Sequence, residues 1–260
     1  MSDLSKYVGR ASQAGASPLA GRRLLLAAIA VSLVLWFVPW SNYLLYPIRL
    51  FVTFVHESGH AVAALATGGS VEGMAVHPDG SGVTYTRGSL LWQWVVLSGG
   101  YVGAAAFGAV MLHFGRLRSG HSGRMALTLA ASLVGFAAVV WGHANPFTLA
   151  VGLLLAIGLG VASRRLSPQG ASLAAAFLAV ECCLDSLSDL RTLFVLTSAG
   201  SQENDAGFMA HAYLLPAGFW AILWAAIAMT LLALSLRSYL RATGAQSAAS
   251  AGKPGVPALR

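Results

Sequence analysis

The chain has 260 residues, of which 57% are hydrophobic and only 10% are charged. Soluble domains carry about 25% charged residues, so this composition excludes an ordinary soluble protein and predicts one that crosses a membrane several times. The net charge of +7 does not indicate nucleic-acid binding, because the basic residues lie mostly near the ends of apolar runs, where they face lipid headgroups.

Polar and apolar runs divide the N-terminal part of the chain. Residues 1–21 are polar and rich in small residues, which predicts a flexible segment. The apolar run Leu24–Trp40 predicts a first membrane span, since aromatic residues at its end are typical of the membrane interface and no small-residue cleavage site follows. A second span is expected to begin at Pro47 and to end at the glycine pair 68–69.

The second span contains the pattern H-E-x-x-H, formed by His56, Glu57 and His60. On a helix, residues four apart share a face, so both imidazoles can bind one metal ion, and Glu57 then lies beside the open position as a general base for water. Seven His and four Glu in 260 residues would give this pattern about 0.003 times by chance. We therefore predict a zinc site. The alternative, two buried histidines and a satisfied glutamate, leaves three polar groups to be explained separately.

A change of character follows the second span. Ser70–Tyr85 contains two short β-like runs separated by the polar residues 77–82, which predicts a hairpin. The hairpin is either an ordinary surface feature or an edge that pairs with an extended peptide next to the metal. The residues alone do not separate these alternatives.

The remaining apolar runs complete a membrane domain. Gly99 and Gly103 form a small-x-x-x-small face that lets another helix approach closely. We predict an all-α polytopic protein with six to seven transmembrane helices and one hairpin, with a single membrane domain at residues 22–240 and a flexible basic tail at 241–260. A polar loop is expected at Ser198–Gly207. The further spans are predicted at Leu90–Phe114, Met125–Trp141, Pro146–Ala162, Ala171–Leu196 and Pro216–Leu236.

Three carboxylates fall inside one of these apolar runs. Glu181, Asp185 and Asp189 are spaced four apart, so they form one stripe along a helix. Carboxylates cannot face lipid at low cost, so the stripe must face a cation or a wet cavity. A catalytic zinc site needs three protein ligands and one open position. Because two histidines supply only two ligands, we expect this stripe to meet the H-E-x-x-H helix.

Three stretches of the chain resemble a known family. The residues VHESGHAVAALATGGSV, and later LSDLRTLFVLTS and NDA, are similar to the "peptidase M50B-like" branch of the site-2 protease family of intramembrane zinc metallopeptidases. The resemblance covers roughly residues 45–235. It implies that His56 and His60 bind zinc and that Glu57 activates water.

The resemblance also implies an aspartate as the third zinc ligand. The Asp-Leu pair of that branch matches Asp189, which we predict as the ligand. The better-known Leu-Asp-Gly motif is absent, and its nearest remnant makes Asp185 the alternative. Asn204 and Asp205 also match the branch pattern, and we interpret them as loop or helix-cap residues.

These observations predict a multi-pass membrane protein, of a bacterial plasma membrane, that acts as a zinc metalloprotease. Its partners would be the lipid bilayer and a membrane protein or peptide, whose peptide bonds it would hydrolyse within or beside the bilayer. One alternative is a proteolytically inactive protein of the same fold that binds zinc or a partner. The other is an ion-coupled transporter, against which the chain shows no inverted repeat. Nothing in the sequence indicates an oligomeric state.

Overall fold

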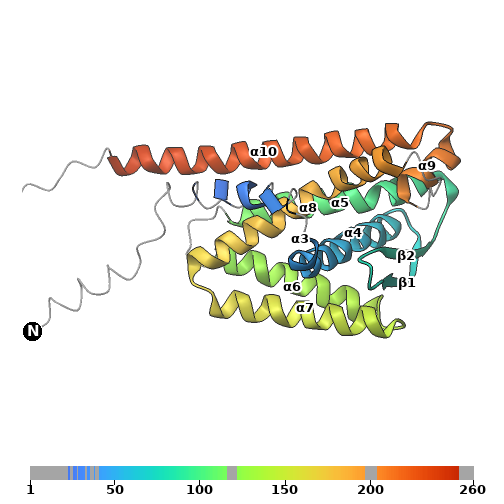
Figure 1. Cartoon of the computed structure of the whole chain (residues 1–260), viewed down its shortest axis with the longest axis horizontal. Helices are drawn as coiled ribbons and strands as arrows, with labels where there is room; N and C mark the ends of the chain where they lie inside the picture. Colours follow the sequence, from blue (N-terminus) through green and yellow to red (C-terminus); the bar gives the residue numbers. More distant parts are fainter. Residues whose placement is uncertain are drawn as a thin grey trace, which may run out of the picture.

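The structure, a computed structural model, describes residues 41–115, 122–196 and 204–251, with short stretches between 23 and 38. These residues form a bundle of helices with one small hairpin (Figure 1). The elements are α3 (Ser41–Leu44), α4 (Tyr46–Ala66), β1 (Ser70–Val76), β2 (Gly82–Arg87), η1 (Leu90–Trp92), α5 (Gln93–Gly115), α6 (Ser122–Val140), α7 (Pro146–Arg165), α8 (Pro168–Leu196), α9 (Asp205–Tyr213) and α10 (Ala217–Ala251).

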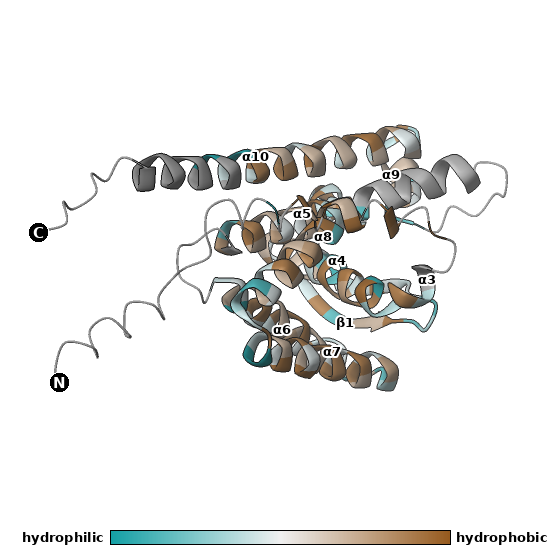
Figure 2. Cartoon of the chain, turned by 60° about the vertical axis from the view of Figure 1, so that its left-hand side comes forward, coloured by the Kyte–Doolittle hydropathy of each residue, from teal (hydrophilic) through white to brown (hydrophobic). Residues whose placement is uncertain are grey.

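Four helices in the described part of the chain are long and apolar enough to cross a membrane. Brown, hydrophobic residues run along the outer helices α6, α7 and α10 (Figure 2), as expected where side chains face lipid. The chain is therefore an integral membrane protein. The four helices cover Leu90–Phe114, Ser122–Val140, Pro146–Arg165 and Ala217–Ser238.

The predicted count of six to seven spans is not confirmed. Helices α4 and α8 are not among the four, and they are the two that carry acidic residues within apolar runs. The predicted first span, Leu24–Trp40, is described only in short, interrupted stretches. The helical class and the hairpin agree with the prediction.

Helix α4 occupies the middle of the molecule (Figure 1). It packs against α5, α6 and α8 and against both strands of the hairpin. Phe51, Phe54 and Val55 of α4 are fully buried, in one core with Leu127 and Val134 of α6. The H-E-x-x-H residues lie on this same helix, so the central packing of the protein also fixes their positions.

Helices α4 and α5 meet backbone to backbone. A Cβ added at Gly59 would lie 2.2 Å from the main-chain oxygen of Gly99, and one added at Gly103 would lie 2.9 Å from the Cα of Gly59. Side-chain atoms cannot approach other atoms so closely, so only glycine fits at this crossing. The predicted small-residue face of Gly99 and Gly103 is confirmed, and its partner is the metal-motif helix.

The hairpin is antiparallel, as predicted, and it is tied to its neighbours on two sides. On β1, Met74 N–H donates to the oxygen of Trp141 and Val76 N–H donates to Thr148 Oγ1. These bonds attach β1 to the α6–α7 connection and to α7. Strand β2 lies against α4, so the hairpin fills the space between α4 and the α6–α7 pair.

One face of α4 holds the turn of the hairpin. Tyr46, Arg49 and Thr53 donate hydrogen bonds of 2.6, 2.7 and 2.8 Å to three successive main-chain oxygens, those of residues 78, 79 and 80. Within the turn, hydrogen bonds from the hydroxyl and the N–H of Ser81 hold the pKa of Asp79 below its ordinary value. The turn is thus fixed both internally and against α4.

Two C-terminal features differ from the sequence prediction. Helix α9 begins at Asp205, inside the predicted loop Ser198–Gly207, because Asn204 caps it by accepting the N–H of Gly207. The cap interpretation of Asn204 is therefore confirmed. Helix α10 continues to Ala251, into the segment expected to be a flexible tail from residue 241. Residues 1–21 and 197–203 lie outside the described part.

Candidate metal centre

His56 and His60 lie one turn apart on α4 and point to a common place. Their Nε2 atoms are 3.1 Å apart. Glu57 joins them: each of the three residues offers a ligand atom, and these atoms lie within 4.8 Å of one another. Glu57 and His60 are buried, at 5% and 7% exposure, and His56 is partly buried. The helical spacing therefore brings the three groups to one place, where they could hold a metal ion.

Each imidazole is oriented by its other ring nitrogen. His56 Nδ1 donates to Asp185 Oδ2 over 2.8 Å, and His60 Nδ1 donates to the main-chain oxygen of Val96 over 2.7 Å. A carboxylate and a carbonyl only accept hydrogen bonds, so Nδ1 carries the proton in both rings. Both Nε2 atoms consequently present lone pairs, which is the arrangement found in metal-ligating histidines.

Asp205 completes the group of donor atoms. Its Oδ2 lies 3.1 Å from the Nε2 of His56 and 3.2 Å from that of His60. The carboxylate oxygen is therefore about as close to each of these nitrogens as the two nitrogens are to each other. Carboxylates bind metal ions in their deprotonated form, so Asp205 offers a third potential donor atom.

Helix α9 is positioned by packing against α5 and α10. Ala206 and Met209 are completely buried against Tyr101 of α5 and Trp224 of α10. Tyr101 also contacts His56 edge to face, with ring centroids 4.5 Å apart. One apolar cluster thus supports both the Asp205 helix and the His56 ring.

The three donor atoms fit a zinc ion. Tetrahedral zinc with bonds of about 2.0–2.1 Å requires its ligand atoms to be about 3.3 Å apart, and the three separations here are 3.1, 3.1 and 3.2 Å. Two neutral Nε2 atoms and a carboxylate oxygen all present lone pairs, so a cation between them relieves their repulsion. The absence of a side chain at Gly100 leaves space for the two imidazoles, because a Cβ there would lie 2.2 Å from the Nε2 of His56 and 2.5 Å from that of His60.

The side chain of Glu57 turns toward the hairpin. Its Oε2 accepts a hydrogen bond of 2.6 Å from Thr84 Oγ1 on β2. A Cβ added at Gly82 would lie 2.6 Å from Oε1. The carboxylate is therefore enclosed between α4 and β2, next to the two histidines, where it can exchange a proton with a water bound between them.

The three residues of the predicted acidic stripe on α8, Glu181, Asp185 and Asp189, do not share one environment. Asp185 meets His56, but at Nδ1, the nitrogen turned away from the donor group. Glu181 makes no ion pair with either histidine in the described part of the chain, and its Oε1 is buried without a hydrogen-bond partner there. Asp189 lies one turn beyond Asp185 on α8, and its side chain falls outside the described residues. Its role as a ligand stays a prediction.

Sequence reasoning did not identify Asp205 as a metal-site residue. The available signal was the Asn-Asp pair at residues 204–205, which matches the branch pattern. We interpreted that pair only as a loop or cap, because no spacing rule connects it to a helix almost 150 residues earlier. The contact of Asp205 with both histidines is visible only in three dimensions.

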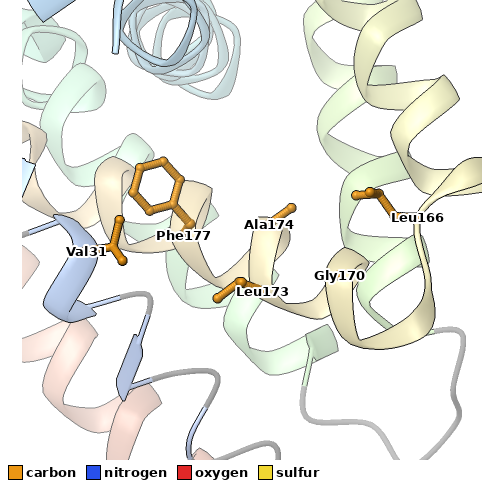
Figure 3. Close-up of a pocket in the computed structure, with 6 residues that line it drawn as sticks. All are labelled: Val31, Leu166, Gly170, Leu173, Ala174 and Phe177. Atoms are coloured by element: carbon orange, nitrogen blue, oxygen red, sulfur yellow. The ribbon is translucent and has the colours of Figure 1, made fainter. Parts of the chain in front are cut away.

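A separate groove lies on the N-terminal half of α8 (Figure 3). Phe177, the lining residue nearest to Asp185 along the helix, precedes it by about two turns. The residues that line the groove are all apolar or glycine, so the groove offers no group for hydrolytic chemistry. They are Val31, Leu166, Gly170, Leu173, Ala174 and Phe177.

The fold and the site together define an integral membrane protein with an H-E-x-x-H group that can hold a metal ion. The chain belongs to the Peptidase M50B-like family, whose model matches residues 25–235. This agrees with the resemblance to site-2 proteases stated above, and it supports a metallopeptidase as the kind of protein. No curated protein and no solved structure is similar enough to the chain to count as a match.

Proposed function

We propose that the protein is a zinc-dependent protease that hydrolyses peptide bonds of membrane proteins or peptides within or beside the bilayer. The observation that carries the proposal is the meeting of three metal-donor atoms, two imidazole nitrogens and one carboxylate oxygen, next to the buried carboxylate of Glu57. Family membership and the four apolar helices support both the metallopeptidase chemistry and the membrane location. A bacterial plasma membrane remains the proposed location.

The proposed ligands are His56, His60 and Asp205. Asp205 takes the place that the sequence assigns to Asp189, because its Oδ2 is the described carboxylate oxygen within 3.2 Å of both Nε2 atoms. Asp185 acts through His56: by accepting a hydrogen bond from Nδ1–H it fixes the ring's orientation and makes Nε2 a better electron donor. The carbonyl of Val96 does the same for His60.

Zinc bound to these ligands would supply Lewis-acid chemistry, polarising the scissile carbonyl and making water more acidic. The chain's own contribution is the movement of the proton. Glu57 accepts the proton of the attacking water and passes it to the leaving amine, so the proton lost by the nucleophile is returned to the product. Burial of the site between α4, α5 and the hairpin keeps bulk water from the carboxylate.

The hairpin is the proposed support for the substrate. A peptide bond in a helix is closed to attack, because its groups are already hydrogen-bonded and surrounded by side chains. An extended peptide can pair with the edge of a strand, and β2 passes directly beside Glu57. We therefore place the unwound substrate segment next to β2.

The experiment uses the purified protein in lipid vesicles together with a mixture of synthetic transmembrane peptides, with products identified by mass spectrometry. The wild type is expected to cleave at least one peptide. Glu57→Gln keeps the shape of the side chain but cannot accept the proton, so cleavage should fall by at least about 100-fold while zinc content stays the same. Cleavage at the wild-type rate by Glu57→Gln would overturn the proposed role of Glu57.

A further inference from the structure

The side chain of Glu57 is held by a hydroxyl of the hairpin. Thr84 Oγ1 lies 2.6 Å from Glu57 Oε2 and 3.0 Å from the main-chain oxygen of Glu57. Both distances are those of hydrogen bonds. One hydroxyl of β2 thus contacts the backbone and the carboxylate of the same residue, which ties the direction of the Glu57 side chain to α4 and to the strand.

Gly82 shapes the same part of β2. Residues two apart on a strand face the same side, so Gly82 and Thr84 both face α4. A Cβ at Gly82 would lie 2.6 Å from Oε1 of Glu57 and 2.7 Å from its Cγ. Gly82 is not among the residues with positive φ, so its backbone does not itself demand glycine. The absent side chain is what leaves room for the carboxylate.

The strand that carries these two residues is a rigid support. Three donors on α4 hold the turn just before β2 by its main-chain oxygens, and β1 is bonded to the α6–α7 connection. A glutamate side chain has three rotatable torsions, so the carboxylate would otherwise sample several positions. Because the strand is held in place, the hydroxyl of Thr84 and the space left by Gly82 together favour one position of the Glu57 carboxylate.

We propose that Gly82 and Thr84 form a seat on β2 that sets the position of the general base, which makes Thr84 a positioning residue for peptide hydrolysis. The inference rests on the proposed function, because that function gives Glu57 the role of base. Thr84 engages Oε2, so Oε1 is the oxygen left to receive the proton of the water. Misplacing a reacting group by about 1 Å can cost about 100-fold in rate.

The test compares three variants of β2 in the vesicle assay. Thr84→Val keeps the shape and removes the hydroxyl, and we expect kcat to fall about 10- to 100-fold with unchanged KM and zinc content. Thr84→Ser restores the hydroxyl and should recover most of kcat. Thr86→Val is the matched control, because Thr86 has the same orientation on β2 and makes no side-chain hydrogen bond among the described residues.

A second measurement does not depend on activity. Thr84→Val, Glu57→Ala and the double variant are compared by their unfolding midpoints in one detergent. If the two side chains interact, the shift of the double variant differs from the sum of the single shifts. Additive shifts would overturn the proposed contact.

The other outcomes also decide the question. Wild-type kcat in Thr84→Val, with Glu57→Gln inactive, would overturn the seat and leave the proposed function standing. Wild-type cleavage in both variants would overturn the role of Glu57 as the base, on which the seat depends, and no cleavage of any peptide by the wild type would overturn the proposed function itself. Loss of zinc or helicity in Thr84→Val, or an equal loss of kcat in Thr86→Val, would assign the effect to hairpin packing and overturn the positioning role. Gly82→Ala, which crowds Oε1 from the same strand, should lower kcat while keeping zinc.

Discussion

Two regions of the molecule build the candidate site in different ways. The first is the continuous segment from α4 through β2 to α5, where the two histidines, the base and its seat all lie between residues 56 and 84. The second consists of α8 and α9, which bring Asp185 and Asp205 from far along the chain. The first region is set by helical spacing and close glycine contacts, and the second by where distant helices pack.

The difference explains why the two regions tolerate change differently. In the first region, no atom can be added at Gly59 or Gly100 without meeting the backbone of α5 or the imidazoles. In the second, the side chains of Asp185 and Asp205 are 20% and 18% exposed, so the carboxylates are less tightly enclosed. We expect changes at the histidines and at these glycines of the first region to abolish or weaken metal binding, and changes in the second region to separate a ligand from a supporting residue.

The largest effect is expected for His60→Ala. This change deletes one of the two imidazole donors, and a pair of remaining ligands does not hold zinc tightly. Zinc should be absent from the purified variant by metal analysis, while helicity measured by circular dichroism stays near that of the wild type. Stoichiometric zinc in His60→Ala would contradict the proposed zinc site.

A smaller but still severe effect is expected for Gly100→Ala. The added Cβ would lie 2.2 Å from His56 Nε2, so either α5 or the imidazole must move out of the donor group. Zinc affinity should fall by more than about 10-fold. The matched control is Gly158→Ala on α7, where a Cβ meets nothing within 4 Å. Equal zinc affinity in the two variants would contradict the close approach of α5 to the metal centre.

A moderate effect is expected for Asp185→Ala. Its carboxylate orients His56 without touching the donor side of the ring, so its loss should weaken zinc binding about 10- to 100-fold and leave measurable zinc. Glu181→Gln serves as the control, since it removes a carboxylate from the same helix without an ion pair to His56. Complete loss of zinc in Asp185→Ala would move Asp185 into the ligand set.

Much of the first region could be predicted from the sequence. The i, i+4 spacing of two histidines fixes a shared helix face, and the glycines at 68–69 end that helix, with Gly68 in the left-handed conformation. Gly99 and Gly103 indicated a close helix contact, although not that Gly59 was the partner. These inferences succeed because each depends on neighbours along the chain.

The second region could be predicted only in part. Charge inside an apolar run indicated that α8 must face the metal site, and Asp185 does meet His56. Spacing along one helix could not reveal which nitrogen it meets. The role of Asp205 could not be predicted, because a helix of nine residues is too short to show a clear sequence periodicity. The position of this helix also depends on its packing with Tyr101 and Trp224. The choice of ligand is a property of that packing.

The zinc content of Asp205→Ala, Asp189→Ala and the wild type, purified in one detergent with helicity checked in each, decides the identity of the third ligand. We expect one zinc per chain in the wild type, none in Asp205→Ala and nearly full content in Asp189→Ala, because Asp205 Oδ2 is the oxygen that lies beside both Nε2 atoms. Full zinc in Asp205→Ala together with its loss in Asp189→Ala would contradict this ligand set and return the third position to α8.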